Sequence, residues 1–202
     1  SLVAFKNNHT IAQKRIRRPS TTSSPDLITI AKGLTSAYAP LSGTIVSEKM
    51  WNVLVQGSDE YGPIGHGWTY SAHPICAAAG VANLELIDEL GLMENAATVG
   101  AYLKAELITA LGDHRHVGEI RGKGMLAAVE FVEDRDDRKF FDPEQKVGPR
   151  IAAALAENGV LGRGMPQGDI LGFAPPFCLT KEEADIVVSK TVEAVKNIIS
   201  EL

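Results

Sequence analysis

Cysteines and long apolar runs are both scarce in this chain of 202 residues. Its two cysteines, Cys76 and Cys178, lie far apart, with no CxxC pair or Cys/His cluster around them. This pattern excludes a disulfide framework and a zinc site, and we expect both cysteines to be buried as small residues. No uninterrupted apolar run approaches the roughly 18 residues that a membrane span requires, so we expect no membrane partner.

The N-terminal residues lack the basic and then apolar pattern of a signal peptide, so we expect a cytoplasmic protein. A formal charge of −5 argues against nucleic-acid binding, and we interpret the basic patch "KRIRRP" at residues 14–19 as a solvated segment. The 45% of hydrophobic residues is enough for a core in one or two globular units.

The apolar pattern along the chain separates a polar beginning from a structured remainder. Residues 1–25 mix scattered apolar residues with basic, Ser, Thr and Pro residues, which predicts a weakly ordered lead-in. After it, short β-branched runs predict strands, and apolar residues at helical spacing predict helices. The predicted strands are 27–31, 41–46, an extended stretch over 116–132, a strand near 160 and 170–173; the predicted helices are 48–55, 74–90, 93–111, 144–157 and 180–202.

Three features within these elements are specific enough to check. Met125, Ala127, Val129 and Phe131 alternate along the extended stretch, so they can share one buried face. Thr180 and Glu183 have the spacing of a capping box, which predicts the start of the last helix. On the predicted helix 93–111, the inward stripe is Ala96, Val99, Leu103, Leu107 and Ala110.

Lys32 lies directly after the first predicted strand, within "TIAKGLTSAYAPLSG" at residues 29–43. An amine at a strand end can form an imine with a carbonyl compound when it is partly desolvated and deprotonated at neutral pH. Taken alone, a lysine followed by glycine also fits an ordinary surface turn. The longer sequence around Lys32 favours the chemical interpretation.

That longer sequence, "PDLITIAKGLTSAYAPLSGTIV" at 25–46, resembles the lysine region of the class III aminotransferases, the omega-transaminase group of fold-type I pyridoxal-phosphate enzymes. "HGWTYSAHPICAAAG" at 66–80 resembles the family's HGxTYSGHPxxxA region, with Ala72 where the family usually has glycine. "VGEIRGKGMLAAVEF" at 117–131 and "FAPPFCLTKEEAD" at 173–185 resemble its C-terminal domain. The resemblance covers about residues 25–202.

The resemblance implies an α/β fold of fold type I. It implies that residues 26–112 form the C-terminal part of the large cofactor-binding domain, and residues 113–202 a small α+β domain. In such enzymes Lys32 would carry pyridoxal 5'-phosphate, and Thr69 would bind the cofactor phosphate across the interface of a homodimer. Arg163 is in a position that resembles an arginine for substrate carboxylates, although a salt bridge at the rim is an equal alternative.

The implied activity is transfer of an amino group from an amine or omega-amino acid to a keto acid such as pyruvate. The family's aspartate for the pyridine nitrogen has no matching segment, and Asp26 belongs to the lysine segment itself. We therefore expect the C-terminal half of an aminotransferase, with weak or no turnover in isolation. The alternatives are a non-catalytic truncated fragment that acts by association, and a related aminomutase or decarboxylase.

Three further motifs are given structural interpretations. We expect His66 and His73 to shape the loop or cap a helix, and "DHRH" at 113–116 to be a solvated turn and not a metal site. "GEIRGKG" at 118–124 is one residue too short for a phosphate-binding loop and has no following Ser or Thr. These segments therefore predict no metal and no nucleotide.

Overall fold

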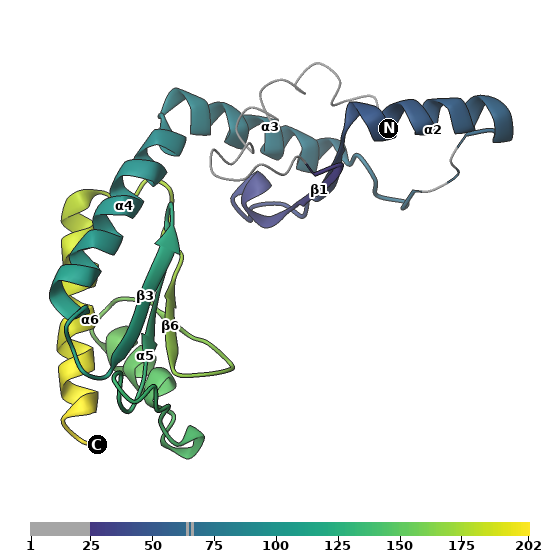
Figure 1. The fold of residues 1–202 in the computed structure, drawn as a ribbon. Helices are drawn as coiled ribbons and strands as arrows, with labels where there is room; N and C mark the ends of the chain where they lie inside the picture. Colours follow the sequence, from purple (N-terminus) through teal and green to yellow (C-terminus); the bar gives the residue numbers. More distant parts are fainter. Residues whose placement is uncertain (1–24, 64, 66) are drawn as a thin grey trace. The chain divides into compact units, whose positions relative to one another are not determined.

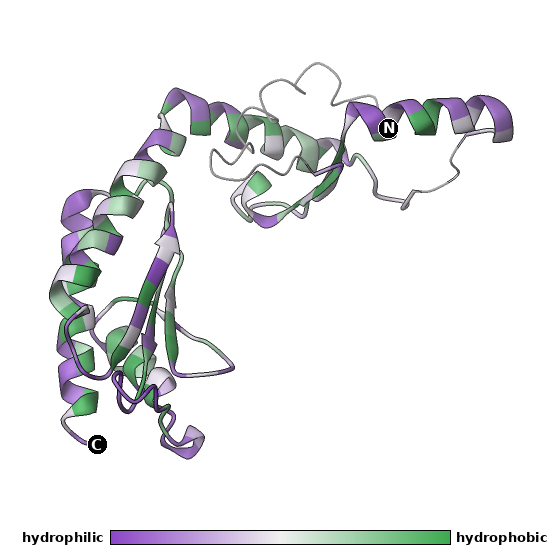
Figure 2. Ribbon diagram, in the orientation of Figure 1, coloured by the Kyte–Doolittle hydropathy of each residue, from purple (hydrophilic) through white to green (hydrophobic). Residues whose placement is uncertain are grey.

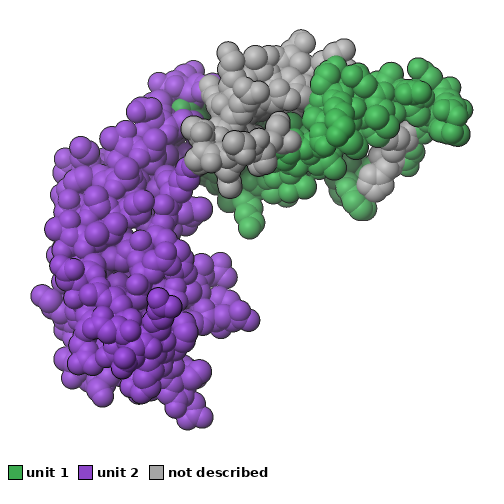
Figure 3. Space-filling view, in the orientation of Figure 1, with its two compact units in different colours: residues 1–87 green, residues 88–202 purple. Residues whose placement is uncertain are grey.

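The structure of the chain is a computed structural model that describes residues 25–63, 65 and 67–202. The chain divides between Ile87 and Asp88 into two compact units (Figure 3). Apart from Pro25, the predicted lead-in of residues 1–25 lies outside the described residues.

The described part of the first unit combines a two-stranded sheet with two α-helices (Figure 1). Strand β1 (Leu27–Ile30) pairs antiparallel with β2 (Gly43–Val46). Helix α2 (Glu48–Tyr61) begins after Ser47, whose hydroxyl accepts a hydrogen bond from the backbone N–H of Met50. Helix α3 (Pro74–Glu89) follows a loop and starts with proline, a residue that suits the first helical position.

Two predictions for the first unit need correction. The helix after β2 was predicted to end near residue 55, but α2 continues to Tyr61, because the Ser58 carbonyl still accepts a helical bond from Gly62. Strand β1 was predicted to be buried, yet Leu27 is 54% exposed, because in the described part of the chain β1 pairs with β2 alone. The strand itself is confirmed.

Helix α3 is apolar along most of its length (Figure 2), which is typical of a helix covered on several sides. Gly80 is nevertheless its one fully buried residue in the structure. The helix is also too short to cross a bilayer, and none of the described helices is long and apolar enough to do so.

The second unit is an antiparallel four-stranded sheet with helices packed against it (Figure 1). The strand order is β3-β4-β6-β5, so the two hairpins meet through β4 and β6. Its elements are α4 (Leu92–Leu111), β3 (Val117–Lys123), β4 (Leu126–Phe131), a 3-10 turn η3 (Pro143–Gln145), α5 (Val147–Glu157), β5 (Arg163–Gly164), β6 (Ile170–Phe173) and α6 (Lys181–Ile199). The strand predicted near residue 160 therefore begins three residues later, at Arg163.

The core of the second unit lies between the sheet and its helices. The predicted face of the extended stretch is confirmed, since Met125, Ala127, Val129 and Phe131 are all buried. The register places Val129 beside Leu171 of β6, which is also buried, so two neighbouring strands contribute to one apolar face.

Helix α4 covers this face with the predicted stripe, except at its end. Ala110 is exposed and Leu111 is buried in its place, because the stripe advances four residues from Leu107 and not three. Near the other end of the helix, a Cβ added to Gly100 would lie 2.0 Å from the carbonyl oxygen of Gly124. Helix and β3–β4 turn therefore meet backbone to backbone.

The last helix is capped as predicted. The Thr180 hydroxyl accepts from the Glu183 N–H, and the Glu183 carboxylate accepts from the Thr180 N–H. Helix α6 packs along α4, which itself contacts β3. These contacts join α4 to the second unit, whereas the sequence led us to place the domain boundary after residue 112. The assignment of domains in the complete enzyme stays a prediction.

A hydrogen bond connects the surfaces of α4 and α6. The Tyr102 hydroxyl donates to the Asp185 carboxylate at 2.7 Å, and the Lys181 ammonium lies 5.3 Å from the centre of the Tyr102 ring. The bond to Asp185 raises the pKa of Tyr102 from 10.0 to about 12, because the carboxylate stabilises the protonated phenol.

We expect one tyrosine to titrate with a pKa of about 12 when absorbance at 295 nm is followed against pH. The folded pKa lies above the unfolded one, so the stabilisation is complete below pH 10 and is lost as the pH rises through about 12. Asp185→Asn should return this titration towards pH 10, while Tyr61→Phe should leave it in place. A curve that is identical in Asp185→Asn would contradict the assignment.

Candidate functional site

Lys32 starts a short 3-10 turn, η2 (Lys32–Thr35), in the loop that joins β1 to β2. The two strands pair from Leu27 opposite Val46 to Ile30 opposite Gly43, so both ends of the loop are held at fixed positions. The lysine therefore lies where the sequence predicted it, directly beyond the end of the first strand.

The loop carries backbone strain around Lys32. Lys32, Ser36 and Ala37 have φ values of 53°, 49° and 63°, in the left-handed region that favours glycine. Each such residue costs about 1–2 kcal/mol, and strain of this kind persists where the surroundings determine the conformation. Strain at a non-glycine residue such as Lys32 is typical of functional sites.

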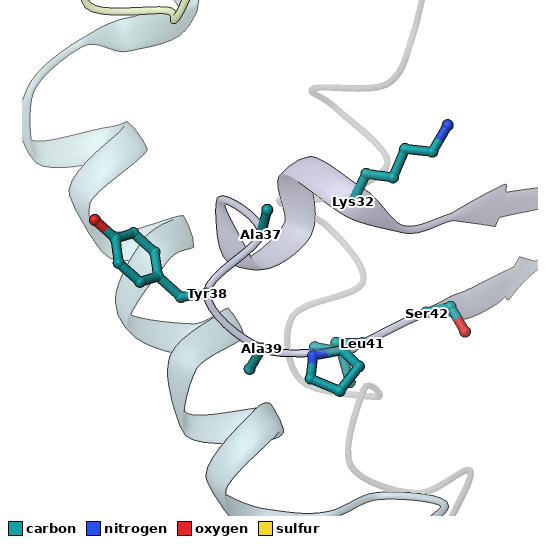
Figure 4. A pocket seen from close by; sticks show the side chains of 7 residues that line it. Lys32, Ala37, Tyr38, Ala39, Leu41 and Ser42 are labelled. Carbon is teal, nitrogen blue, oxygen red and sulfur yellow. The ribbon is translucent and has the colours of Figure 1, made fainter.

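Lys32 borders a hollow of about 600 Å³, which is otherwise lined by residues 37–42 (Figure 4). Figure 4 shows Lys32 extending from the start of the turn, while Tyr38 points away on the other side of the loop. Both side chains are exposed. The partial desolvation expected for Lys32 is not seen among the described residues, so it stays a prediction.

Helix α3 holds the turn from one side through Asn83 and Gly80. The Asn83 amide nitrogen donates to the carbonyls of Gly33 at 3.0 Å and Leu34 at 3.2 Å, and its oxygen accepts from the Ser36 hydroxyl at 2.6 Å. At Gly80 an added Cβ would lie 2.8 Å from a methyl carbon of Leu41, so helix and loop approach closely.

Sequence reasoning treated this helix as a support that does not enter the site, and it missed Asn83. One signal was available, since asparagine has a low helix propensity and interrupts the apolar first part of the helix.

Thr69 lies in the turn before α3 and is exposed. The Ser71 side chain and backbone form this turn, with the Trp68 N–H donating to the Ser71 hydroxyl at 3.0 Å. Ala72 has a φ of 56°, a conformation in which glycine is unstrained and alanine is not. Thr69 is not among the residues that line the hollow beside Lys32.

The described histidines His73 and His114 take part in local hydrogen bonds. The His73 carbonyl accepts the N–H of Ala77 and so belongs to the start of α3, while its buried Nδ1 finds no partner in the described part of the chain. His66 lies outside the described residues. His114 accepts from the backbone N–H of His116 within a turn, and the described residues contain no group of three His, Cys, Asp or Glu that could hold a metal ion.

Arg163 is exposed in the short strand β5, which pairs with β6 through Gly172. The sequence left a salt bridge and a substrate carboxylate as equal alternatives. Arg163 forms no ion pair with a described residue, so the salt bridge is absent from this part of the chain. Its guanidinium remains able to bind a carboxylate through two parallel hydrogen bonds.

Asp26 has a structural partner of its own. Its carboxylate accepts from Lys49 at 3.2 Å and from the Ser47 hydroxyl at 3.0 Å. The Lys49 ammonium, followed by the hydroxyl, holds the pKa of Asp26 below its ordinary value. Because Asp26 already binds Lys49 and Ser47, these contacts agree with the expectation that Asp26 is not the aspartate that pairs with the pyridine nitrogen of the cofactor.

Both cysteines are free, as the spacing predicted, but their expected burial is only partly right. Cys76 in α3 is half-buried, and Cys178 in the loop before α6 is exposed. Its neighbours Phe177 and Leu179 accept hydrogen bonds from Asn95 through their carbonyls.

Comparison with known proteins identifies the class. The family description "Aminotransferase class-III" matches residues 19–195. A diaminobutyrate–2-oxoglutarate transaminase from Halomonas elongata is 58% identical over 174 residues, which are 86% of this chain and 37% of that protein. The mitochondrial gamma aminobutyrate transaminase 1 of Solanum lycopersicum is 35% identical over 81% of this chain and 31% of its own length.

Solved structures of transaminases also resemble this chain. A transaminase structure from directed evolution by ancestral reconstruction has a TM-score of 0.87 and 57% identity, over 89% of this chain and 39% of its own. An (S)-enantioselective omega-transaminase from Thermomicrobium roseum has a TM-score of 0.80 and 37% identity, over 88% and 38%.

The structural neighbours carry the α/β fold of the pyridoxal-phosphate transaminases, and this chain places Lys32 on a turn after a strand of that fold. The chain belongs to the class III aminotransferases. The family resemblance and the predicted fold class are therefore confirmed. The chain spans less than two fifths of the length of the H. elongata relative.

The conformation of Ala72 leads to a prediction for stability. Ala72→Gly should raise the free energy of unfolding by about 1 kcal/mol, because glycine removes the cost of the left-handed region. Ala78→Gly, an exposed position inside α3, should instead lower it by about 1 kcal/mol. Urea denaturation measures both, and a loss of stability in Ala72→Gly would contradict the strained turn.

Proposed function

We propose that this chain provides the lysine-bearing part of a pyridoxal-phosphate aminotransferase. The reaction moves an amino group from an amine or omega-amino acid to a keto acid. The observation that carries the proposal is Lys32 itself, held in a strained left-handed conformation at the edge of a hollow of about 600 Å³. A solvent-facing lysine with no chemical task could use an ordinary turn without this strain.

The residues present fit the cofactor. Lys32 offers an accessible primary amine beside the hollow, and it forms no ion pair with a described residue. When bound, the coenzyme supplies an aldehyde and a conjugated ring that accepts electrons. Lys32 would hold it through Nζ, and Thr69 would donate its hydroxyl to the phosphate.

In the reaction the Lys32 amine acts as a base and then as an acid. With the coenzyme bound, Lys32 Nζ would take a proton from the substrate carbon as a base and would then deliver that proton as an acid to complete the transfer. Such a base must be desolvated, and Lys32 is exposed in this chain. We propose that further polypeptide of the complete enzyme covers it, since the chain spans 37% of the length of its H. elongata relative.

Substrate choice is also a proposal. Pyruvate was the acceptor expected from the sequence, and the name of the 58% identical relative adds diaminobutyrate as donor and 2-oxoglutarate as acceptor. Both acceptors present a carboxylate that the Arg163 guanidinium, which forms no ion pair with a described residue, could bind. The cytoplasmic location expected from the sequence stays a prediction.

The proposal is tested by labelling the 202-residue chain with pyridoxal phosphate, reducing with borohydride and mapping the label by mass spectrometry. We expect the label at Lys32 to exceed that at every other lysine, and Lys32→Arg to remove it, since guanidinium keeps the charge but cannot react in this way. Label spread evenly over surface lysines would favour the non-catalytic fragment. Analysis of products from the complete enzyme separates an aminotransferase from an aminomutase or decarboxylase.

We also propose a homodimer. Thr69 lies outside the lining of the hollow beside Lys32, which agrees with a role towards the cofactor of a second subunit. Light scattering should give twice the 21.6 kDa mass of the chain. A monomer at every protein concentration would contradict this assembly for the 202-residue chain.

A further inference from the structure

The turn of Lys32 is weakly held by its own backbone. Its hydrogen bonds from Ser36 to Gly33 and from Ala37 to Lys32 measure 3.3 and 3.4 Å, at the long end for this type of bond. Lys32, Ser36 and Ala37 all have positive φ values in the same short segment. Strained backbone with long internal bonds requires an external contact to remain in one conformation.

Asn83 supplies that contact with all parts of its side-chain amide. The carbonyls of Gly33 and Leu34 can only accept, so they fix the amide nitrogen on their side. The amide oxygen then faces Ser36, whose hydroxyl donates to it at 2.6 Å. The three bonds join residues 47–50 positions apart in the sequence, so one side chain ties the turn to α3.

A second contact, within the loop itself, also holds the turn. The buried Thr35 hydroxyl donates to the Ala39 carbonyl at 2.6 Å, which closes the loop beyond the turn. Gly33, Leu34 and Ser36 are therefore held by α3, and Thr35 by the loop. Lys32, at the start of this assembly, borders the hollow.

We propose that Asn83 is a positioning residue for Lys32. It fixes the turn in the left-handed conformation and so sets the direction from which the lysine amine meets a carbonyl compound. The inference rests on the proposed function of Lys32, and it adds a residue on α3 that does not touch the reacting atoms.

The test compares three variants of the 202-residue chain. Asn83→Asp keeps the size of the side chain and the acceptor for Ser36, but it cannot donate to the Gly33 and Leu34 carbonyls. Ser36→Ala removes the third bond alone. Asn95→Asp is the matched control, because Asn95 donates in the same way to the carbonyls of Phe177 and Leu179 in the second unit.

Two readouts are taken from each chain. The first is the ratio of borohydride-fixed pyridoxal-phosphate label at Lys32 to that at Lys49, an exposed lysine of the same unit. The second is amide hydrogen exchange at residues 34–38, with exchange in α3 and the second unit reporting that the chain remains folded.

We expect Asn83→Asp to lower the label ratio roughly tenfold and to speed exchange in the turn, because two carbonyls lose their partner. Ser36→Ala should give a smaller change in the same direction. Asn95→Asp should leave the label ratio and the turn exchange as in the wild type.

The outcomes separate this inference from the proposed function. If the wild type shows no preference for Lys32, the proposed function fails, and exchange in the turn alone decides whether Asn83 holds it. If the wild type prefers Lys32 and Asn83→Asp keeps the same ratio, the positioning role is overturned, whether or not exchange changes.

Discussion

The attachment of one strained turn to one helix is the constraint on which the candidate site depends. Residues 32–37 include three non-glycine residues with positive φ, and their own backbone bonds are long. The Asn83 amide and the close approach at Gly80 keep α3 against this segment. Without that attachment, the strand before Lys32 would still deliver the lysine to the loop, but no contact would select its direction.

The two units differ in how they are stabilised. All fully buried hydrophobic side chains of the described residues belong to the second unit, from Ala96 to Val195. Among the described residues of the first unit, Thr35 and Gly80 are buried, and α2 has no buried residue. The second unit therefore has the usual hydrophobic core, whereas the described part of the first relies on backbone pairing and side-chain hydrogen bonds.

The sequence predicted most of the second unit because its patterns are local. Alternation from Met125 to Phe131 and the capping box at Thr180 each follow from residues close in the chain, and both are confirmed. The burial of β1 was wrong, because it depends on which other segments are present, and α2 was predicted too short, because its helical bonds continue to Gly62. The family was recognised from its motifs and is confirmed by the relatives.

Within the candidate site, the position of Lys32 after a strand was predictable and its exposure was not. Desolvation requires atoms from elsewhere, and no local pattern reports them. Asn83 was missed because its partners lie about 50 residues earlier, where only the folded chain brings them together. The roles of Lys32, Thr69 and Arg163 stay predictions, since they depend on a cofactor and on chain segments beyond these units.

The backbone contact between Gly100 and Gly124 has a consequence for how the sequence of the second unit can vary. Where two side chains meet, a change in one can be offset by a change in the other. Here a carbonyl oxygen occupies the space that any Cβ at position 100 would need, so no second substitution can restore the fit. Variation in α4 must therefore occur at positions around Gly100 and not at Gly100 itself.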